Sequence, residues 1–325
     1  MNQTPIFTTD TSVFGLLMLT LAFVFFTSSK KTGFWSKFYA FIPALLMCYL
    51  LPAILTSLNL ISPELTNTYA IAKNYLLPAA LVLMTLSLDL KAVFNLGPKA
   101  LIMFITGTIG IVIGGPIAIL LVSIFSPETI GGAGFDAVWR GLSTLAGSWI
   151  GGGANQTAMF EIFNYNPEKY GAMVLVDIVV AQLWMALLLL GIGQKERIDR
   201  WLKADNSAIE ELKNKVSVYE KSVAKIPTLT DYMILFGIAF TSVGIAHFGA
   251  ANISLFLSKN FEIFNDKTSA LSSFTSIFFW MISLATIIGI VLSFTKMKKY
   301  EGAGASKLGS VFIYILVATI GMKMD

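Results

Sequence analysis

Long apolar blocks are the feature that most constrains this chain. They occur at about 12–28, 38–57, 69–88, 99–125, 138–163, 170–193, 229–250, 271–294 and 306–324 of its 325 residues. Several exceed the roughly 20 apolar residues that a helix needs to cross a bilayer. Only 13% of the residues are charged, against about a quarter in soluble domains. Because a helix satisfies its own backbone in lipid, the sequence predicts an all-α polytopic membrane protein.

The composition excludes several kinds of site and partner. Cys48 is the only cysteine and His247 the only histidine, which excludes an intrachain disulfide, a thiolate metal cluster and a His-rich metal or haem site. The net charge of +4 calls for no nucleic-acid partner, because the basic residues lie in loops beside apolar blocks. No cofactor is expected. The expected partners are the lipid bilayer, a small-molecule or ion substrate, and a second copy of the chain in a homodimer.

The charge pattern divides the chain into three parts. Residues 1–193 form a first membrane half, 194–228 a charged linker with eight Lys and Arg, and 229–325 a second membrane half. Glu211 and Lys215 are spaced i, i+4, which favours a short helix in the linker. Basic loops stay on the cytoplasmic side, so the linker is predicted to be cytoplasmic. It is either a solvated connection or a regulatory, partner-binding helix.

An internal similarity connects the two membrane halves. Residues 75–90 (YLLPAALVLMTLSLDL) and 311–325 (VFIYILVATIGMKMD) share an apolar helix, a Thr, a small residue and a final aspartate. The alignment of the two segments can be set either on Thr85 or on Asp89. Such duplication is typical of transporters with inverted halves; chance similarity of two helix ends is the alternative. The second copy stops at Asp325, before any partner broken helix, so the second repeat is expected to be incomplete and the chain a truncation or a reduced variant.

The lysine distribution predicts that one segment does not cross the membrane. Lys91 and Lys99 on one side, and the linker on the other, are both expected to face the cytoplasm. Three apolar segments lie between them, and three full crossings would place the two ends on opposite sides. The segment 138–163, which glycines interrupt, is therefore expected to be re-entrant.

That segment contains the sequence GSWIGGGANQTAM at 147–159. Each Gly in a helix interior costs about 1 kcal/mol against Ala, so three in a row predict a break. A break at membrane depth frees backbone groups and helix ends that can bind an ion or an anionic group. Neighbouring amide and hydroxyl side chains add donors and acceptors. The alternative is a close helix crossing, which also selects small residues. The candidate residues are Gly151, Gly152, Gly153, Asn155, Gln156 and Thr157.

Asp177 is a second candidate, within GAMVLVDIVVAQ. A carboxylate deep in an apolar span is costly and by default functional. Burial favours its protonated form and a nearby cation favours its charged form, so the group can exchange a proton for sodium. Asn155, Thr157 and Asp177 form a candidate sodium site. A structural hydrogen bond is the alternative role for Asp177, and Asp89 and Asp325 are expected to be solvated at span ends.

Together, GSWIGGGANQTAM, NPEKYGAMVLVD, LSLDLKAV and YILVATIGMKMD resemble the bacterial membrane proteins of domain of unknown function family 819, over essentially the whole chain. That family is similar to the cation:proton antiporter and bile-acid:sodium symporter superfamily. The resemblance implies a panel and a core built from inverted repeats in a bacterial cytoplasmic (inner) membrane. It also implies an essential aspartate at the place of Asp177. The superfamily's Gly-Gly-x-x-Asn pattern matches Gly152, Gly153 and Asn155 with only one residue between. It also implies a broken helix that spans, in conflict with the re-entrant prediction.

These observations predict a secondary active transporter that is coupled to protons or sodium. It is expected to move a small organic anion or similar metabolite by alternating access. The alternatives are a cation:proton antiporter and a non-transporting scaffold or sensor. An intramembrane enzyme is not expected, because His247 is the only conventional base and lies far along the chain from any Gly-x-Ser-like context.

Overall fold

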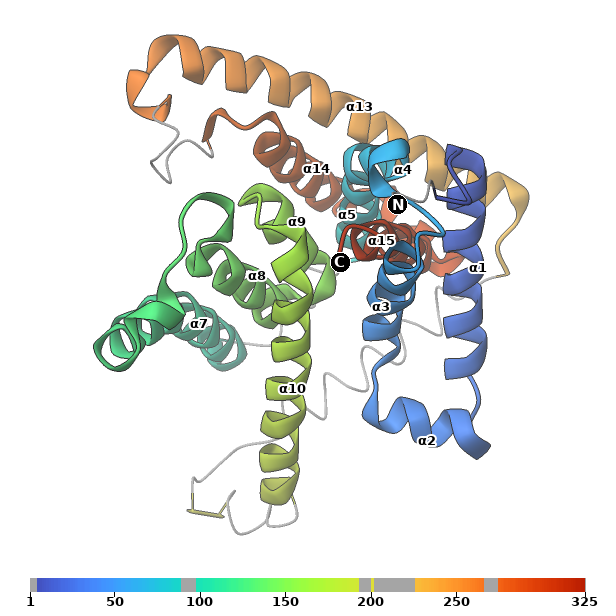
Figure 1. The fold of residues 1–325 in the computed structure, drawn as a ribbon. Helices are drawn as coiled ribbons and strands as arrows, with labels where there is room; N and C mark the ends of the chain where they lie inside the picture. The colour runs from blue at the N-terminus through green and yellow to red at the C-terminus, as the bar shows by residue number, and fades with distance from the viewer. Residues whose placement is uncertain (1–4, 89–97, 193–199, 202–225, 266–273, 325) are drawn as a thin grey trace.

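The computed structural model describes residues 5–88, 98–192, 200–201, 226–265 and 274–324 (Figure 1). Most of the linker, together with Asp89 and Asp325, lies outside these described residues. The α-helices among them are α1 (Asp10–Ser28), α2 (Gly33–Phe41), α3 (Ala44–Ser57), α4 (Thr68–Ile71), α5 (Leu77–Leu86), α7 (Pro98–Phe125), α8 (Val138–Gly151), α9 (Gly153–Ile162), α10 (Pro167–Ile192), α13 (Leu229–Asn260), α14 (Ile277–Ser293) and α15 (Ala305–Gly321). A π-helical turn, η2 (Ala72–Leu76), joins α4 to α5. Short 3-10 turns are η1 (Pro63–Leu65), η3 (Pro127–Ile130), η4 (Gly134–Asp136), η5 (Glu262–Phe264) and η7 (Lys296–Ala303).

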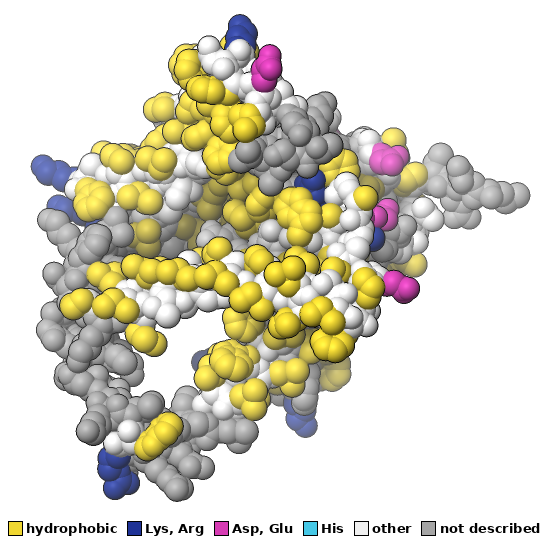
Figure 2. Space-filling model, turned by 90° about the vertical axis from the view of Figure 1, so that its left-hand side faces the viewer, with side chains coloured by type: hydrophobic (Ala, Val, Ile, Leu, Met, Phe, Trp, Pro, Cys, Tyr) yellow, Lys and Arg dark blue, Asp and Glu magenta, His cyan; other side chains and the backbone are white. Residues whose placement is uncertain are grey.

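Helices account for the apolar blocks. Within the described residues, five helices are long and apolar enough to cross a membrane: Asp10–Ser28, Thr68–Leu86, Leu101–Phe125, Pro167–Leu188 and Leu229–Asn260. Two bent pairs, α2 with α3 and α14 with η7, pass the same criterion jointly. Hydrophobic side chains cover much of the face in Figure 2. The chain is an all-α polytopic membrane protein, as predicted.

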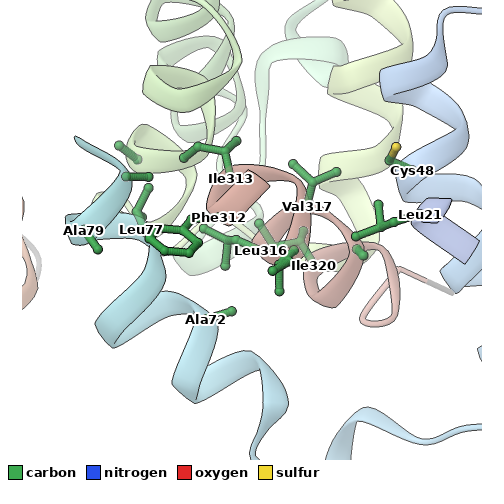
Figure 3. Packing of buried hydrophobic residues seen from close by; sticks show 14 of the residues in the cluster. Leu21, Cys48, Ala72, Leu77, Ala79, Phe312, Ile313, Leu316, Val317 and Ile320 are labelled. Atoms are coloured by element: carbon green, nitrogen blue, oxygen red, sulfur yellow. The ribbon is translucent and has the colours of Figure 1, made fainter. Parts of the chain in front are cut away.

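The core is built around α15. Leu316 and Ile320 of this helix are completely buried, and side chains of α1, α3 and α5 surround it (Figure 3). The backbones approach closely at Gly321, where an added Cβ would lie 2.3 Å from the carbonyl oxygen of Tyr49. Small residues allow such contact between helices in a membrane protein.

The two similar segments run in opposite directions. Gly309, near the start of α15, packs against Met84, near the end of α5. Lys323, just after α15, places its ammonium group 3.8 Å from the ring centroid of Tyr69 in α4. An inverted repeat requires antiparallel copies. That the two segments are copies, which superimpose after rotation, stays a prediction.

The block 38–57 is not one straight span, contrary to the boundaries drawn from the sequence. Its helices α2 and α3 meet at 97°. Pro43 lies at the junction and has no N–H for a helical hydrogen bond. A proline also disfavours helical geometry in the preceding residue, and Ile42 is extended at φ −112° and ψ 105°.

Helix α13 also differs from its expected bounds. Its start is fixed by a capping box between Thr228 and Asp231. Its end lies at Asn260, ten residues beyond the predicted end at 250. The polar residues there do not end the helix, because Asn252 donates a hydrogen bond to the Phe248 carbonyl at 2.8 Å and Asn260 to the Phe256 carbonyl at 2.7 Å. His247 is therefore inside a helix, where it is exposed.

Candidate functional site

The helix break predicted in 138–163 is confirmed. Helix α8 ends at Gly151 and α9 begins at Gly153. Between them, Gly152 has φ 86° and ψ −173°, a conformation that only glycine adopts readily. This one residue separates the two helices.

Helices α8 and α9 fold back on each other as a hairpin (Figure 1). At its open end, Arg140 donates hydrogen bonds to the carbonyl groups of Gly134 and Phe163. The rings of Trp139 and Phe163 also meet there, with centroids 5.5 Å apart. The 14 residues of α8 rise about 21 Å, less than the roughly 30 Å hydrocarbon core. A hairpin of this length fits the re-entrant segment that the lysine distribution predicts. That it enters the membrane without crossing it stays a prediction.

Glycines let the two arms of the hairpin approach. A Cβ on Gly147 would lie 2.8 Å from the carbonyl oxygen of Asn155. A Cβ on Gly151 would lie 1.7 Å from the side-chain nitrogen of the same Asn155. The close crossing that the sequence left as an alternative is therefore present, together with the polar contacts at the tip.

Asp177 of α10 meets the tip of this hairpin. Its Oδ2 accepts hydrogen bonds from Ser148 Oγ at 2.7 Å and from Gln156 Nε2 at 3.3 Å. Its Oδ1 accepts one from Trp149 Nε1 at 2.7 Å. Ser148 and Trp149 come from the last turn of α8, and Gln156 from the first turn of α9. Asp177 is ten residues after Pro167, the start of α10, or about 15 Å along the helix.

The three partners of this carboxylate are all neutral. In the described part of the chain, the ion pairs are Lys73 with Glu161 and Lys169 with Asp136, so no lysine or arginine there pairs with Asp177. Neutral donors stabilise a carboxylate but leave its charge uncompensated, which is costly away from water. A proton or a small cation can supply the missing compensation. Two carboxylate oxygens accept about four hydrogen bonds, so acceptor capacity remains.

The structure brings together only part of the predicted set. Gln156 is 1% exposed and contacts Asp177. Thr157 instead donates to the Gly153 carbonyl at 2.9 Å. Asn155 packs over Gly151 and lines a cavity of about 490 Å³ between α7 and α8. Among the described residues, neither Asn155 nor Thr157 hydrogen-bonds Asp177, so the three predicted sodium ligands are not joined here.

Ser148 and Trp149 are contacts that the sequence analysis did not assign. Both lie in the predicted motif, before the three glycines and separated from them by Ile150. The available signal was the chemistry: an indole N–H and a hydroxyl next to a helix break need acceptors when water is excluded. Which acceptor they reach depends on how α10 packs against the hairpin, and this packing has no local signature.

Comparison with known families gives one result. The family described as "Protein of unknown function (DUF819)" matches residues 15–325. No match was found among curated proteins or among solved structures. The similarity to the antiporter and symporter superfamily stays a prediction.

Proposed function

We propose that this chain, which belongs to the DUF819 family of proteins of unknown function, is a secondary active transporter coupled to protons or sodium. It moves a small organic anion or similar metabolite by alternating access in a bacterial inner membrane. One observation carries the proposal: the Asp177 carboxylate meets the tip of the α8–α9 hairpin through three neutral donors. An ionisable group at such a depth is by default functional.

In this proposal Asp177 carries the coupling ion and the hairpin tip responds to its charge. A charged carboxylate makes the stronger hydrogen bonds with Ser148 and Trp149, and these bonds weaken when a proton or cation neutralises it. The contact between hairpin and α10 then has two states of different stability. A ligand shifts such an equilibrium only by its difference in affinity for the two states. The break at Gly152 forms the tip of the hairpin. In this proposal, the tip binds the ion or the substrate.

We propose a carrier and not an enzyme. Nucleophilic catalysis needs a base within hydrogen-bond reach of a nucleophile. The one histidine, His247, is exposed on α13, whereas the polar contacts of the hairpin tip converge on Asp177 of α10. No cofactor enters the proposal.

A substrate-free measurement tests the ion site first. The full-length protein in detergent is unfolded thermally while sodium replaces choline at constant ionic strength, at several pH values. A ligand that binds only the folded state raises its stability, by about 2.7 kcal/mol at 100 times Kd. We expect sodium or added protons to raise the Tm of the wild type and not of Asp177→Asn. Asp10→Asn, at the exposed start of α1, is the matched control and keeps the response.

Transport is tested in proteoliposomes that contain the full-length protein. A panel of organic anions is offered with and without a sodium or proton gradient. We expect Asp177→Asn to fold normally and lose gradient-driven uptake, because an amide keeps the shape but carries no charge. Exchange of substrate across the membrane is retained in this variant. Concentrative uptake by Asp177→Asn at the wild-type rate would reject the proposed role of Asp177.

A further inference from the structure

A second polar cluster lies near the open end of the hairpin. Glu161, in the last turn of α9, is 3% exposed. Its carboxylate lies 2.7 Å from the Lys73 ammonium group and accepts a hydrogen bond from the Tyr69 hydroxyl. Beside this cluster is a cavity of about 740 Å³. Its walls include Tyr69, Lys73, Phe135, Glu161, Tyr165 and Lys323.

Irregular backbone positions Lys73 in this wall. The helical run from Thr68 to Leu86 contains one π-helical turn, at Ala72–Leu76, and Lys73 is part of it. Such π turns are rare in proteins, and those that occur often lie at functional sites. The Lys73 ammonium group also lies 4.8 Å from the ring centroid of Phe278. A buried acid and an aromatic ring thus hold it in place.

Lys323 contributes a second ammonium group. Its Nζ lies 3.8 Å from the ring centroid of Tyr69. The backbone is anchored just before it, where Thr56 Oγ1 donates to the Met322 carbonyl at 2.8 Å. Within the part of the chain that the structure describes, no carboxylate forms an ion pair with Lys323. Its charge therefore faces the cavity without an anionic partner there.

The charges of the wall do not balance. Lys73 and Lys323 supply two positive charges and Glu161 one negative charge. The other acid of the cavity, Asp136, is paired with Lys169 at 3.0 Å. One positive charge remains in a partly buried wall. An anion binds such a charge more strongly than it binds a charge that is fully exposed to water. The unbalanced charge selects an anion.

The cavity's size and walls define the rest of the ligand. Ligand sites typically measure about 300–1,000 Å³ and combine apolar walls with a few polar groups. Aromatic side chains, including the buried Phe160 and Tyr165, supply the apolar surface. We propose that this cavity binds a small monocarboxylate with an apolar or aromatic body, and that Lys323 holds its carboxylate. That it is the entry site for the transported anion rests on the proposed function.

The cavity and the hairpin tip share helix α9. Glu161 is five residues after Gln156, or about 7.5 Å along the helix. An anion bound at Lys323 therefore lies in a cavity that the open end of the hairpin lines, and the tip of the same hairpin contacts Asp177. This arrangement fits an entry site that leads to the ion site.

Binding of fluorinated probes to the full-length protein in detergent tests the proposal. The probes are 4-fluorobenzoate, the neutral 4-fluorobenzyl alcohol and the cationic 4-fluorobenzylamine, each followed by fluorine NMR. We expect only the carboxylate to bind well. Loss of a hydrogen bond to a charged group weakens binding about tenfold or more, so Lys323→Gln is expected to weaken 4-fluorobenzoate binding by that factor. Lys323→Arg keeps the charge and is expected to retain most of the binding.

Lys307→Gln is the matched control. Lys307 is an exposed lysine near the other end of α15, 16 residues and about 24 Å from Lys323. It is expected to bind the probe as the wild type does. Equal binding by the wild type and by Lys323→Gln at wild-type Tm, or no preference for the carboxylate over the alcohol, would overturn the proposal.

The binding result separates this proposal from the transport proposal. Binding that depends on Lys323, in a protein without gradient-driven uptake, would support the cavity and reject transport. Uptake that depends on Asp177 but is insensitive to Lys323→Gln, without loss of probe binding, would reject the cavity.

Discussion

At the break between α8 and α9, the backbone of Gly152 adopts φ 86°. Side chains rarely tolerate this conformation, which costs about 1–3 kcal/mol at non-glycine residues. Gly151, beside it, faces the Asn155 side chain. Two of the three glycines therefore have separate roles: Gly152 turns the chain and Gly151 makes room for an amide.

Replacement of Gly152 by alanine is expected to destabilise the protein. The added Cβ meets no atom within 4 Å, so the penalty is backbone strain of about 1–3 kcal/mol. Thermal unfolding in detergent measures it as a lower Tm. Gly244→Ala in α13 is the control, because that glycine also has open space and an ordinary helical backbone. This control is expected to be neutral or stabilising by up to about 1 kcal/mol. A Gly152→Ala protein with the wild-type Tm would contradict the strain argument.

At the scale of elements, a polar clasp closes the open end of the hairpin. Asp136 in η4 accepts a hydrogen bond from Asn166 at 2.8 Å and pairs with Lys169 of α10. The Asn166 N–H donates to the Phe135 carbonyl at 3.0 Å. The clasp ties the loop before α8 to the start of α10, and so fixes the helix that carries Asp177.

This clasp is expected to depend on pH. The hydrogen bond from Asn166, and then Lys169, lower the pKa of Asp136 below its ordinary value. A carboxyl with a lowered pKa stabilises the fold above its unfolded pKa, about 3.9, and loses this contribution as pH falls through the folded pKa. The Tm difference between wild type and Asp136→Asn is therefore expected to be present at pH 6 and to shrink below about pH 4. A difference that is constant from pH 7 to pH 3 would exclude the ionised carboxyl as its cause.

Local sequence signals predict some elements well and others poorly. Hydropathy predicts the spans, and the glycine run predicts the break at Gly152, because both signals are local. The predicted block 38–57 missed the bend at Pro43, and the predicted block 229–250 ended before α13 does. A single proline or a polar run has more than one structural outcome. The partners of Asp177 arise when α10 packs on the hairpin. Contacts between distant segments have no periodic signature in one sequence.

For the whole molecule, the hairpin decides which loops share a side of the membrane. The loop before α8 and the start of α10 meet in the clasp of Asp136 with Asn166 and Lys169. They therefore lie on one side, and if α10 crosses the membrane the charged linker after it is expected on the other. Basic residues in the linker predict that its side is the cytoplasm, so the two hairpin ends are expected to face out.

Cysteine labelling in intact cells tests this arrangement. Cys48 is 1% exposed and is replaced by serine to give a background without cysteine. Thr129→Cys before α8 and Glu168→Cys at the start of α10 replace exposed residues. Both are expected to react with an impermeant thiol reagent from outside, because a re-entrant hairpin has both of its ends on one side of the membrane. Ser207→Cys, in the linker and outside the described residues, is expected to react only after permeabilisation. Reaction of Thr129→Cys with protection of Glu168→Cys would mean that 138–163 spans the membrane; outside labelling of Ser207→Cys would reverse the predicted orientation.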